Sequence, residues 1–185
     1  MADGGARQAA IDHLWRLTPA NTRRAPYLHC ILDAARDPAI YAGLERFRAR
    51  EQIVSLYQGP TAEELADVAP YLVCLGSNPA LFDWIWEEGW GKSWGIFFWS
   101  VLSVEGLRTH FRRLTRVKTD DGATLLFRFY DPRVLSAFLP TCDPAQTREL
   151  FGPIGHFYTE TNDPPGIAEF THADGVPRRR FLPFP

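Results

Sequence analysis

The stretch Leu125-Leu-Phe-Arg-Phe-Tyr-Asp-Pro-Arg-Val-Leu135 carries the clearest structural signal in this 185-residue chain. Its first half is rich in leucine and aromatic residues, with Arg128 between two phenylalanines, which is typical of a strand. Asp131 and Pro132 follow. They favour the start of a helix, because aspartate caps free backbone N–H groups and proline fits the first helical position. The stretch therefore predicts a strand that leads directly into a helix.

Three charged side chains surround this corner, namely Arg128, Asp131 and Arg133. If Arg128 points inward it needs a carboxylate partner, because a buried, unpaired guanidinium is very costly and a carboxylate accepts two of its donors at once. Asp131 is close in sequence, but the helix cap competes for its oxygens. We interpret the three residues as a structural motif that braces the corner, in preference to a catalytic group.

Upstream of the corner, segments of strand and helix composition alternate. Apolar runs predict strands, while proline-preceded caps and periodic apolar residues predict helices. The predicted strands are 26–33, 52–57, 71–75 and 94–99, and the predicted helices are 37–47, 78–89 and 104–114. This alternation predicts an α/β fold with a mostly parallel central sheet flanked by helices.

A hairpin is expected over residues 117–126, because the Asp-Gly pair within it suits a tight turn between antiparallel strands. We place this antiparallel hairpin at one edge of the sheet. From Thr161 onwards the composition shifts to proline, glycine, aspartate and arginine. The sequence therefore predicts a single α/β domain over residues 1–160 and a Pro- and Arg-rich C-terminal tail over residues 161–185.

Composition narrows the class of protein. The net charge of −2 does not favour a nucleic-acid partner. The three cysteines form no close pair, so a reducing compartment is expected and a disulfide framework is not. The N-terminus has no apolar core of the kind a signal peptide needs, and the most apolar run, 94–104, is too short to span a bilayer. We expect a cytoplasmic protein with no membrane partner.

One alternative is a cysteine-dependent α/β enzyme that uses Cys74 or Cys30 as nucleophile and His110 or His156 as base. Cys30 follows His29 directly, but neighbours on a strand point to opposite faces and cannot simply work together. The histidines lack the spacing of zinc ligands, and no phosphate-binding glycine loop or nucleophile elbow occurs. The sequence predicts no catalytic residue, metal or cofactor.

Two groups of side chains are candidates for binding a protein partner. Trp84 and Trp86 are two apart on one predicted helix, so both cannot face the same core, and an exposed tryptophan is favoured in binding hot spots. Trp90 or an N-terminal helix over 7–17 could instead cover the outer ring. The second group is an arginine stripe at four-residue spacing: Arg108, Arg112 and Arg116. This stripe suits an acidic partner, although a simply solvated face stays open as an alternative.

Several motifs, in their order along the chain, resemble the domain-of-unknown-function family 4123 (DUF4123). They are Tyr71–Leu75, the helix with Trp84 and Trp86, Trp94–Ser100, Leu107–Arg116, Phe127–Leu135 and Phe151–Ile154. The resemblance implies an adaptor chaperone of bacterial type VI secretion and no enzyme. Such a protein binds a toxic effector and helps to load it onto the spike complex (VgrG/PAAR type), so its implied partners are an effector and a spike protein.

Overall fold

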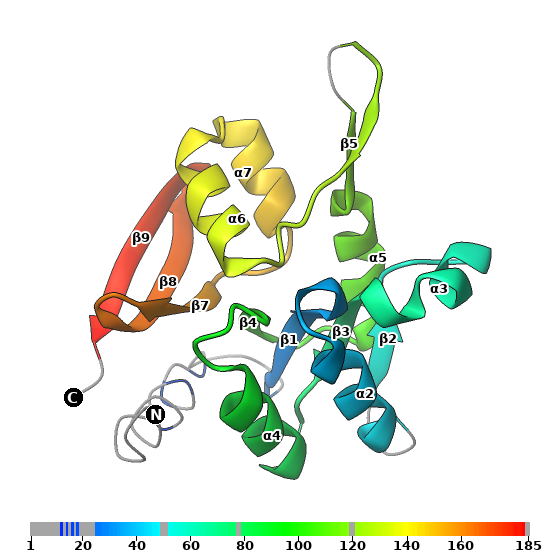
Figure 1. Cartoon of the computed structure of the whole chain (residues 1–185). Coiled ribbons are helices and arrows are strands. Elements are labelled where there is room, and N and C mark those ends of the chain that lie inside the picture. The colour runs from blue at the N-terminus through cyan, green and yellow to red at the C-terminus, as the bar shows by residue number, and fades with distance from the viewer. Residues whose placement is uncertain are drawn as a thin grey trace.

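The computed structural model describes residues 12, 14, 16, 18, 25–48, 52–76, 79–118 and 121–183 (Figure 1). Most of the expected N-terminal helix, 7–17, lies outside these residues. The strands are β1 (Tyr27–Asp33), β2 (Ile53–Ser55), β3 (Pro70–Cys74), β4 (Gly95–Ser100), β5 (Arg116–Lys118), β6 (Thr124–Leu126), β7 (Phe157–Asn162), β8 (Pro165–Ala173) and β9 (Val176–Pro183). The α-helices are α2 (Pro38–Phe47), α3 (Pro60–Glu64), α4 (Pro79–Gly89), α5 (Val104–Leu114), α6 (Pro132–Phe138) and α7 (Pro144–Phe151).

The expectation of a mostly parallel sheet is wrong. The main sheet has seven strands in the order β2-β3-β1-β4-β7-β8-β9, and each neighbouring pair is antiparallel. Strands β1 and β2 are parallel to each other, because both run antiparallel to β3, which lies between them. The same holds for β3 and β4, with β1 between them. The helices α2 and α4 thus join parallel strands that are not neighbours, as in the split βαβ motif.

The hairpin over residues 117–126 is confirmed, but its predicted position is wrong. Strands β5 and β6 pair antiparallel and form a separate two-stranded sheet away from the edges of the main sheet. The alternation of strands and helices predicts strand direction, whereas the order of strands in the sheet depends on which apolar faces meet in the fold. A strand pattern in the sequence therefore does not say which strand will pair with it.

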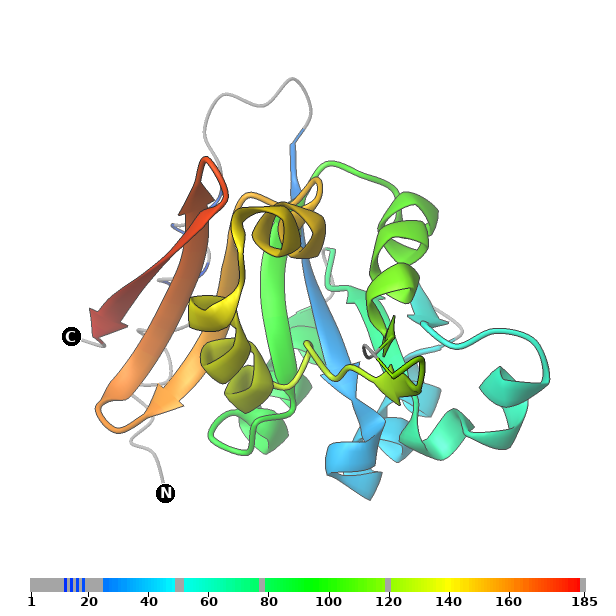
Figure 2. The same ribbon diagram turned by 90° about the horizontal axis from the view of Figure 1, so that it is seen from above.

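The main sheet separates two hydrophobic cores. Helices α2 and α4 cover one face and α5, α6 and α7 cover the other (Figures 1 and 2). Strand β1 shows the alternation that makes this possible. Leu28, Cys30 and Leu32 belong to the core under α2 and α4, whereas Ile31 belongs to the core under α5 to α7.

The segment expected as a C-terminal tail contributes β8 and β9 to the main sheet. The turn between these strands is made by Asp174 and Gly175, which both have positive φ angles. The proline and arginine content of the segment fits the position of β9, because such residues are common on edge strands, where they discourage pairing with other chains. Figure 2 shows β7, β8 and β9 extending the sheet beyond β4.

Candidate functional site

A partly buried ion pair connects the loop after β6 to strand β1 in the interior of the main sheet. The Arg128 guanidinium donates to Oδ2 of Asp33 through Nε, at 2.8 Å, and through Nη2. Asp33 ends β1 and its side chain is 1% exposed, whereas that of Arg128 is 35% exposed. The sequence predicts that Arg128 needs a carboxylate, but the partner lies 95 residues away in the chain. The only indication of this partner in the sequence was that Asp33 is a single aspartate at the end of an apolar strand.

The predicted strand-to-helix corner is confirmed at its helical end. Asp131 caps α6 by accepting the backbone N–H of Arg133 at 2.9 Å, with Pro132 at the start of the helix. The Arg133 guanidinium also donates to both oxygens of Asp131, at 3.0 and 2.5 Å. The strand itself ends earlier than expected, because β6 stops at Leu126 and Arg128 begins a turn closed by the Asp131 N–H.

Burial and hydrogen bonds act in opposite directions on the pKa values of the two carboxyls at this junction. Burial raises the pKa of Asp33, and the hydrogen bonds from Arg128 oppose that rise only in part. Burial acts in the same direction on Asp131, but the hydrogen bonds from Arg133 bring the pKa of this carboxyl below its ordinary value. The buried Tyr130, which interacts with the Tyr57 hydroxyl, has a pKa raised by burial and by Asp33. The Arg128–Asp33 pair holds the β6–α6 loop on the sheet.

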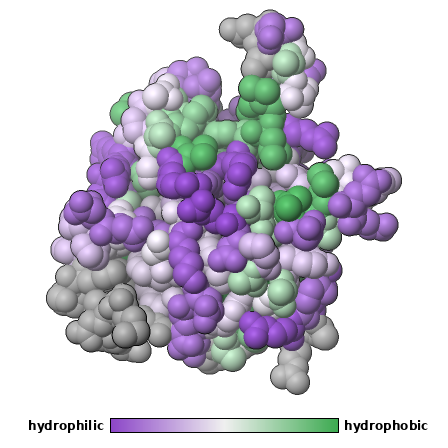
Figure 3. Space-filling view, viewed as in Figure 1, coloured by the Kyte–Doolittle hydropathy of each residue, from purple (hydrophilic) through white to green (hydrophobic). Residues whose placement is uncertain are grey.

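An apolar surface patch lies directly above this junction. Its exposed residues are Leu65 (41%), Leu125 (51%) and Leu126 (53%), which line one hollow. Figure 3 shows apolar side chains gathered along the β5–β6 hairpin and on both sides of its base, with polar side chains next to them. We call these three residues the hairpin patch. Contiguous apolar surface of this kind marks sites where proteins bind other molecules.

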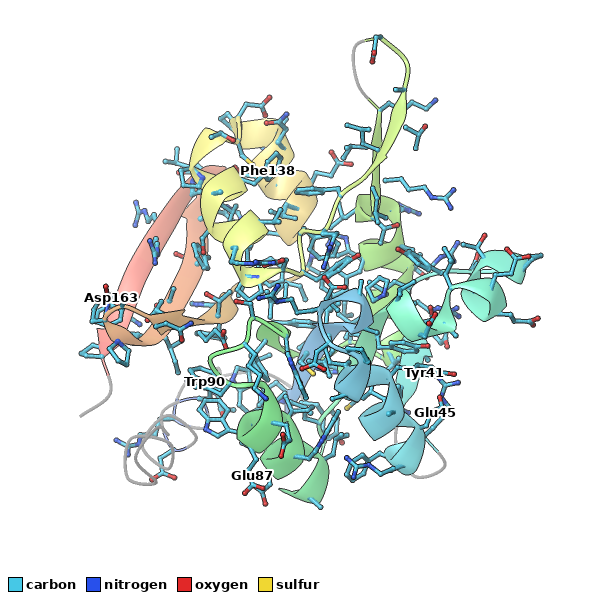
Figure 4. All side chains as sticks on the ribbon, viewed as in Figure 1. Tyr41, Glu45, Glu87, Trp90, Phe138 and Asp163 are labelled. Carbon is cyan, nitrogen blue, oxygen red and sulfur yellow. The ribbon has the colours of Figure 1, made fainter. Side chains whose placement is uncertain are left out.

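Two hollows flank the base of the hairpin. The first, of about 320 Å³, lies between the hairpin and α3 and is lined by Tyr57, Thr61, Leu65, Arg116, Thr124, Leu125 and Leu126. The second, of about 500 Å³, is an open depression along α6 that contains Phe138 (Figure 4). The Phe138 ring packs edge-on against Phe127, with the ring centroids 4.6 Å apart. Both hollows are lined by apolar and charged side chains together.

The three candidate tryptophans belong to the packing between α2, α4 and the sheet. Trp86 is 2% exposed and stacks on Trp90, whose position at the end of α4 is labelled in Figure 4. Trp84 lies against Gly43 of α2, where a Cβ atom would overlap its ring, and packs between Phe47 and Trp94. Any contact of Trp84 or Trp90 with a partner therefore depends on the parts of these rings that stay at the surface.

The arginine stripe divides into different environments. Arg108 donates to the backbone carbonyls of Ser55, at 2.9 Å, and Tyr57, at 3.3 Å, and so ties α5 to the end of β2. Arg112 is partly buried, whereas Arg116 is exposed and lines the hollow between the hairpin and α3. Of the three predicted partner-binding arginines, Arg116 alone lines that hollow.

Cys30 and Cys74 lie on β1 and β3, whereas the bases of the enzyme hypothesis, His110 and His156, lie on α5 and just before β7. Cys30 is fully buried under α2 and α4, and burial raises the pKa of its thiol. Cys74 lies opposite His29 in the β1–β3 ladder, and burial lowers the pKa of His29 to about 4, which makes it a weak base. His110 is hydrogen-bonded to the Leu150 carbonyl, and His156 is paired with Glu169.

The described part of the chain contains no group of three or more His, Cys, Asp and Glu side chains that could hold a metal ion. None of the described helices combines the length and apolar character needed to cross a membrane.

Three comparisons with known proteins complement this geometry. Residues 28–149 match the profile of the family described as Domain of unknown function (DUF4123). The chain is 29% identical over 118 residues to the accessory protein VasW of Vibrio cholerae serotype O1. The aligned part covers 63% of this chain and 39% of that relative. No solved structure matches the chain.

Proposed function

Because the chain belongs to the DUF4123 family, we propose that it is an accessory protein of a bacterial type VI secretion system that acts as an adaptor chaperone. In this role it binds an effector in the cytoplasm, keeps it soluble and helps to load it onto a spike protein. The name of its relative, an accessory protein, agrees with such a supporting role. The proposal treats the protein as a binding module without catalytic activity of its own.

The hairpin patch is the observation that supports a binding function most directly. It places Leu125 and Leu126, each about half exposed, beside a hollow of about 320 Å³ and next to Arg116. Apolar side chains around a central hollow, with arginine nearby, are typical of protein-binding surfaces. The ion pair between Arg128 and Asp33 anchors the loop that follows β6, at the base of this surface.

Co-production with candidate partners tests this function. The tagged chain is produced with an effector and with a spike protein encoded next to its gene, and complexes are isolated by size-exclusion chromatography. We expect a stable complex with at least one of them, with an interface of about 800 Å² or more on each side. If neither the effector nor the spike protein binds, the adaptor function is wrong.

Two variants locate the binding surface in the same experiment. Replacing Leu125 and Leu126 by serine removes the most exposed part of the patch and is expected to abolish the complex. Val176→Ser is the matched control, because Val176 is 57% exposed but lies on β9. Equal loss of binding in both variants would show that general apolar exposure, and not the hairpin patch, carries the interaction.

A further inference from the structure

The β5–β6 hairpin is unusual in how little of it is buried. All three residues of β5 and all three of β6 are exposed, and the hairpin projects away from the main sheet (Figure 1). Among the described residues neither strand pairs with anything but the other. A two-stranded hairpin is only marginally stable by itself, so this element gains much from a further strand.

The hydrogen-bond pattern shows which backbone groups face outward. The Phe127 N–H donates to the Thr115 carbonyl at 2.9 Å, so these two residues form a hydrogen-bonded pair. Hydrogen-bonded and non-hydrogen-bonded pairs alternate along an antiparallel ladder. The pair Lys118–Thr124 and the pair Arg116–Leu126 are therefore non-hydrogen-bonded pairs. Their N–H and C=O groups point away from the partner strand and are available to another chain.

The same alternation places side chains. Arg116, Thr124 and Leu126 share one face of the hairpin, and all three line the hollow against Tyr57 and Leu65. A strand added along β6 would direct every second side chain towards this hollow. Apolar side chains at those positions would cover Leu126 and Leu65, which are now about half exposed.

Charge favours one kind of added strand. Both charged residues of β5 are basic, Arg116 and Lys118, and Arg113 lies at the end of the preceding helix. On the other side of the hollow, α3 and the following turn carry acidic side chains, Glu63, Glu64 and Asp67. A partner strand with a carboxylate on the hairpin side is therefore attracted, and one with a carboxylate on the α3 side is repelled.

We propose that β6 is a docking edge for an extended segment of a partner protein, which adds to the hairpin as a third strand. The segment is apolar at alternate positions and carries a carboxylate that meets Arg116. Its apolar side chains fill the hollow between Leu126, Tyr57 and Leu65. The inference rests on the proposed binding function and adds to it the mode of recognition.

A display library of random short peptides tests the edge and does not require that the partner be identified. Peptides that bind the full chain are selected, and their binding to two variants of the chain is then measured. Thr124→Pro removes an outward N–H, a change that edge strands tolerate, and Leu126→Asp places a charge in the hollow. We expect enriched peptides with alternating apolar residues and an acidic position, and binding to either variant about tenfold weaker or worse.

Val176→Ser is the matched control, because Val176 is exposed but lies on β9, outside the hairpin patch. It is expected to bind the selected peptides as the unchanged chain does. The inference is overturned if no peptide is enriched above the bare support, or if the enriched peptides bind Thr124→Pro as well as the unchanged chain.

Amide hydrogen exchange separates failure of this inference from failure of the proposed function. In a complex with the co-produced effector, the amides of Thr124 and Leu126 should exchange at least about tenfold more slowly than in the free chain. The Leu125 amide, already bonded inside the hairpin, should change less. A stable complex with unchanged Thr124 and Leu126 amides would refute strand addition while leaving the adaptor function in place.

Discussion

Leu125 and Leu126 expose about half of their side chains, 51% and 53%, whereas Asp131, five residues further on, is 2% exposed. The hairpin and the junction that follows it thus reverse the usual distribution, with apolar residues outside and charges inside. The junction uses its charges for structure, because Arg128 and Asp131 both have partners. The hairpin leaves its apolar residues uncovered. Stability should therefore depend on the charges, and binding on the leucines.

Removing the Arg128 side chain is the strongest test of this contrast. Arg128→Ala leaves the buried Asp33 carboxylate without its ion-pair partner, which should lower the free energy of unfolding by about 3 kcal/mol or make the protein insoluble. Urea unfolding followed by tryptophan fluorescence measures the change. Arg48→Ala is the control, because Arg48 and its partner Glu45 are both exposed, 44% and 42%, and the loss of such a surface pair should cost about 1 kcal/mol or less. A soluble Arg128→Ala protein with an unchanged free energy of unfolding would show that the Arg128–Asp33 ion pair does not stabilise the fold.

Acid should destabilise the protein through His29, which lies buried on β1 near the junction. Burial lowers the pKa of His29 to about 4 from its ordinary 6.5, although its hydrogen bond to the Tyr27 carbonyl opposes this. Between these values the unfolded chain binds the proton and the folded chain does not. The free energy of unfolding should therefore fall as the pH drops from 6.5 to 4, by about 3 kcal/mol from this group.

Unfolding curves at several pH values measure this slope, and His29→Gln should flatten it. Asp33 works in the opposite direction at low pH, since burial raises the pKa of its carboxyl in the folded state. The Asp33 carboxyl therefore contributes most to the free energy of unfolding below pH 3.8, its ordinary pKa, where it is protonated. That contribution is lost as the pH rises through the higher pKa that Asp33 has in the folded state. An unchanged pH slope in His29→Gln would show that His29 is not the group that destabilises the fold in acid.

The hairpin should show the reverse behaviour, with loss of binding and unchanged stability. Leu126→Asp is expected to weaken partner binding by about 2 kcal/mol, or roughly 30-fold, because it places a charge at the centre of an apolar surface. Its free energy of unfolding should stay within about 0.5 kcal/mol of the unchanged chain, as at other exposed positions. Isothermal titration calorimetry and urea unfolding measure the two quantities. A large loss of stability would show that Leu126, like Arg128, is needed for folding and not only for binding.

The sequence predicted local structure well at particular places. The cap at Asp131, the hairpin over 117–126 and the opposite faces of His29 and Cys30 each depend on residues close together in the chain. Sequence-based prediction failed where the structure depends on contacts between distant segments of the chain. The partner of Arg128, the insertion of β1 between β3 and β4 and the pairing of β8 with β7 arise from contacts that no local pattern encodes.

The candidate site shows the same limit. The sequence predicts a strand at Leu125 and Leu126 but not their exposure, because composition records that a residue is apolar and not whether anything covers it. The spacing of Trp84 and Trp86 predicts that one helix cannot bury both in the same core. Trp86 is buried, whereas Trp84 packs against Gly43 of α2 and stays partly exposed. Which side chains stay uncovered is a property of the assembled fold.

The arginine stripe on α5 allows the finest test, because it spans both regions. Arg108→Ala removes the hydrogen bonds to the Ser55 and Tyr57 carbonyls and should lower the free energy of unfolding by about 1 kcal/mol. Arg116→Ala should change stability by less than about 0.5 kcal/mol, because this residue is exposed, and should weaken partner binding instead. Parallel urea unfolding and calorimetry of the two variants separate the effects. Equal loss of binding in both variants, with no change in stability, would show that the arginine stripe is a single docking surface. Structural and binding residues would then not be separated on α5 as they are between the junction and the hairpin.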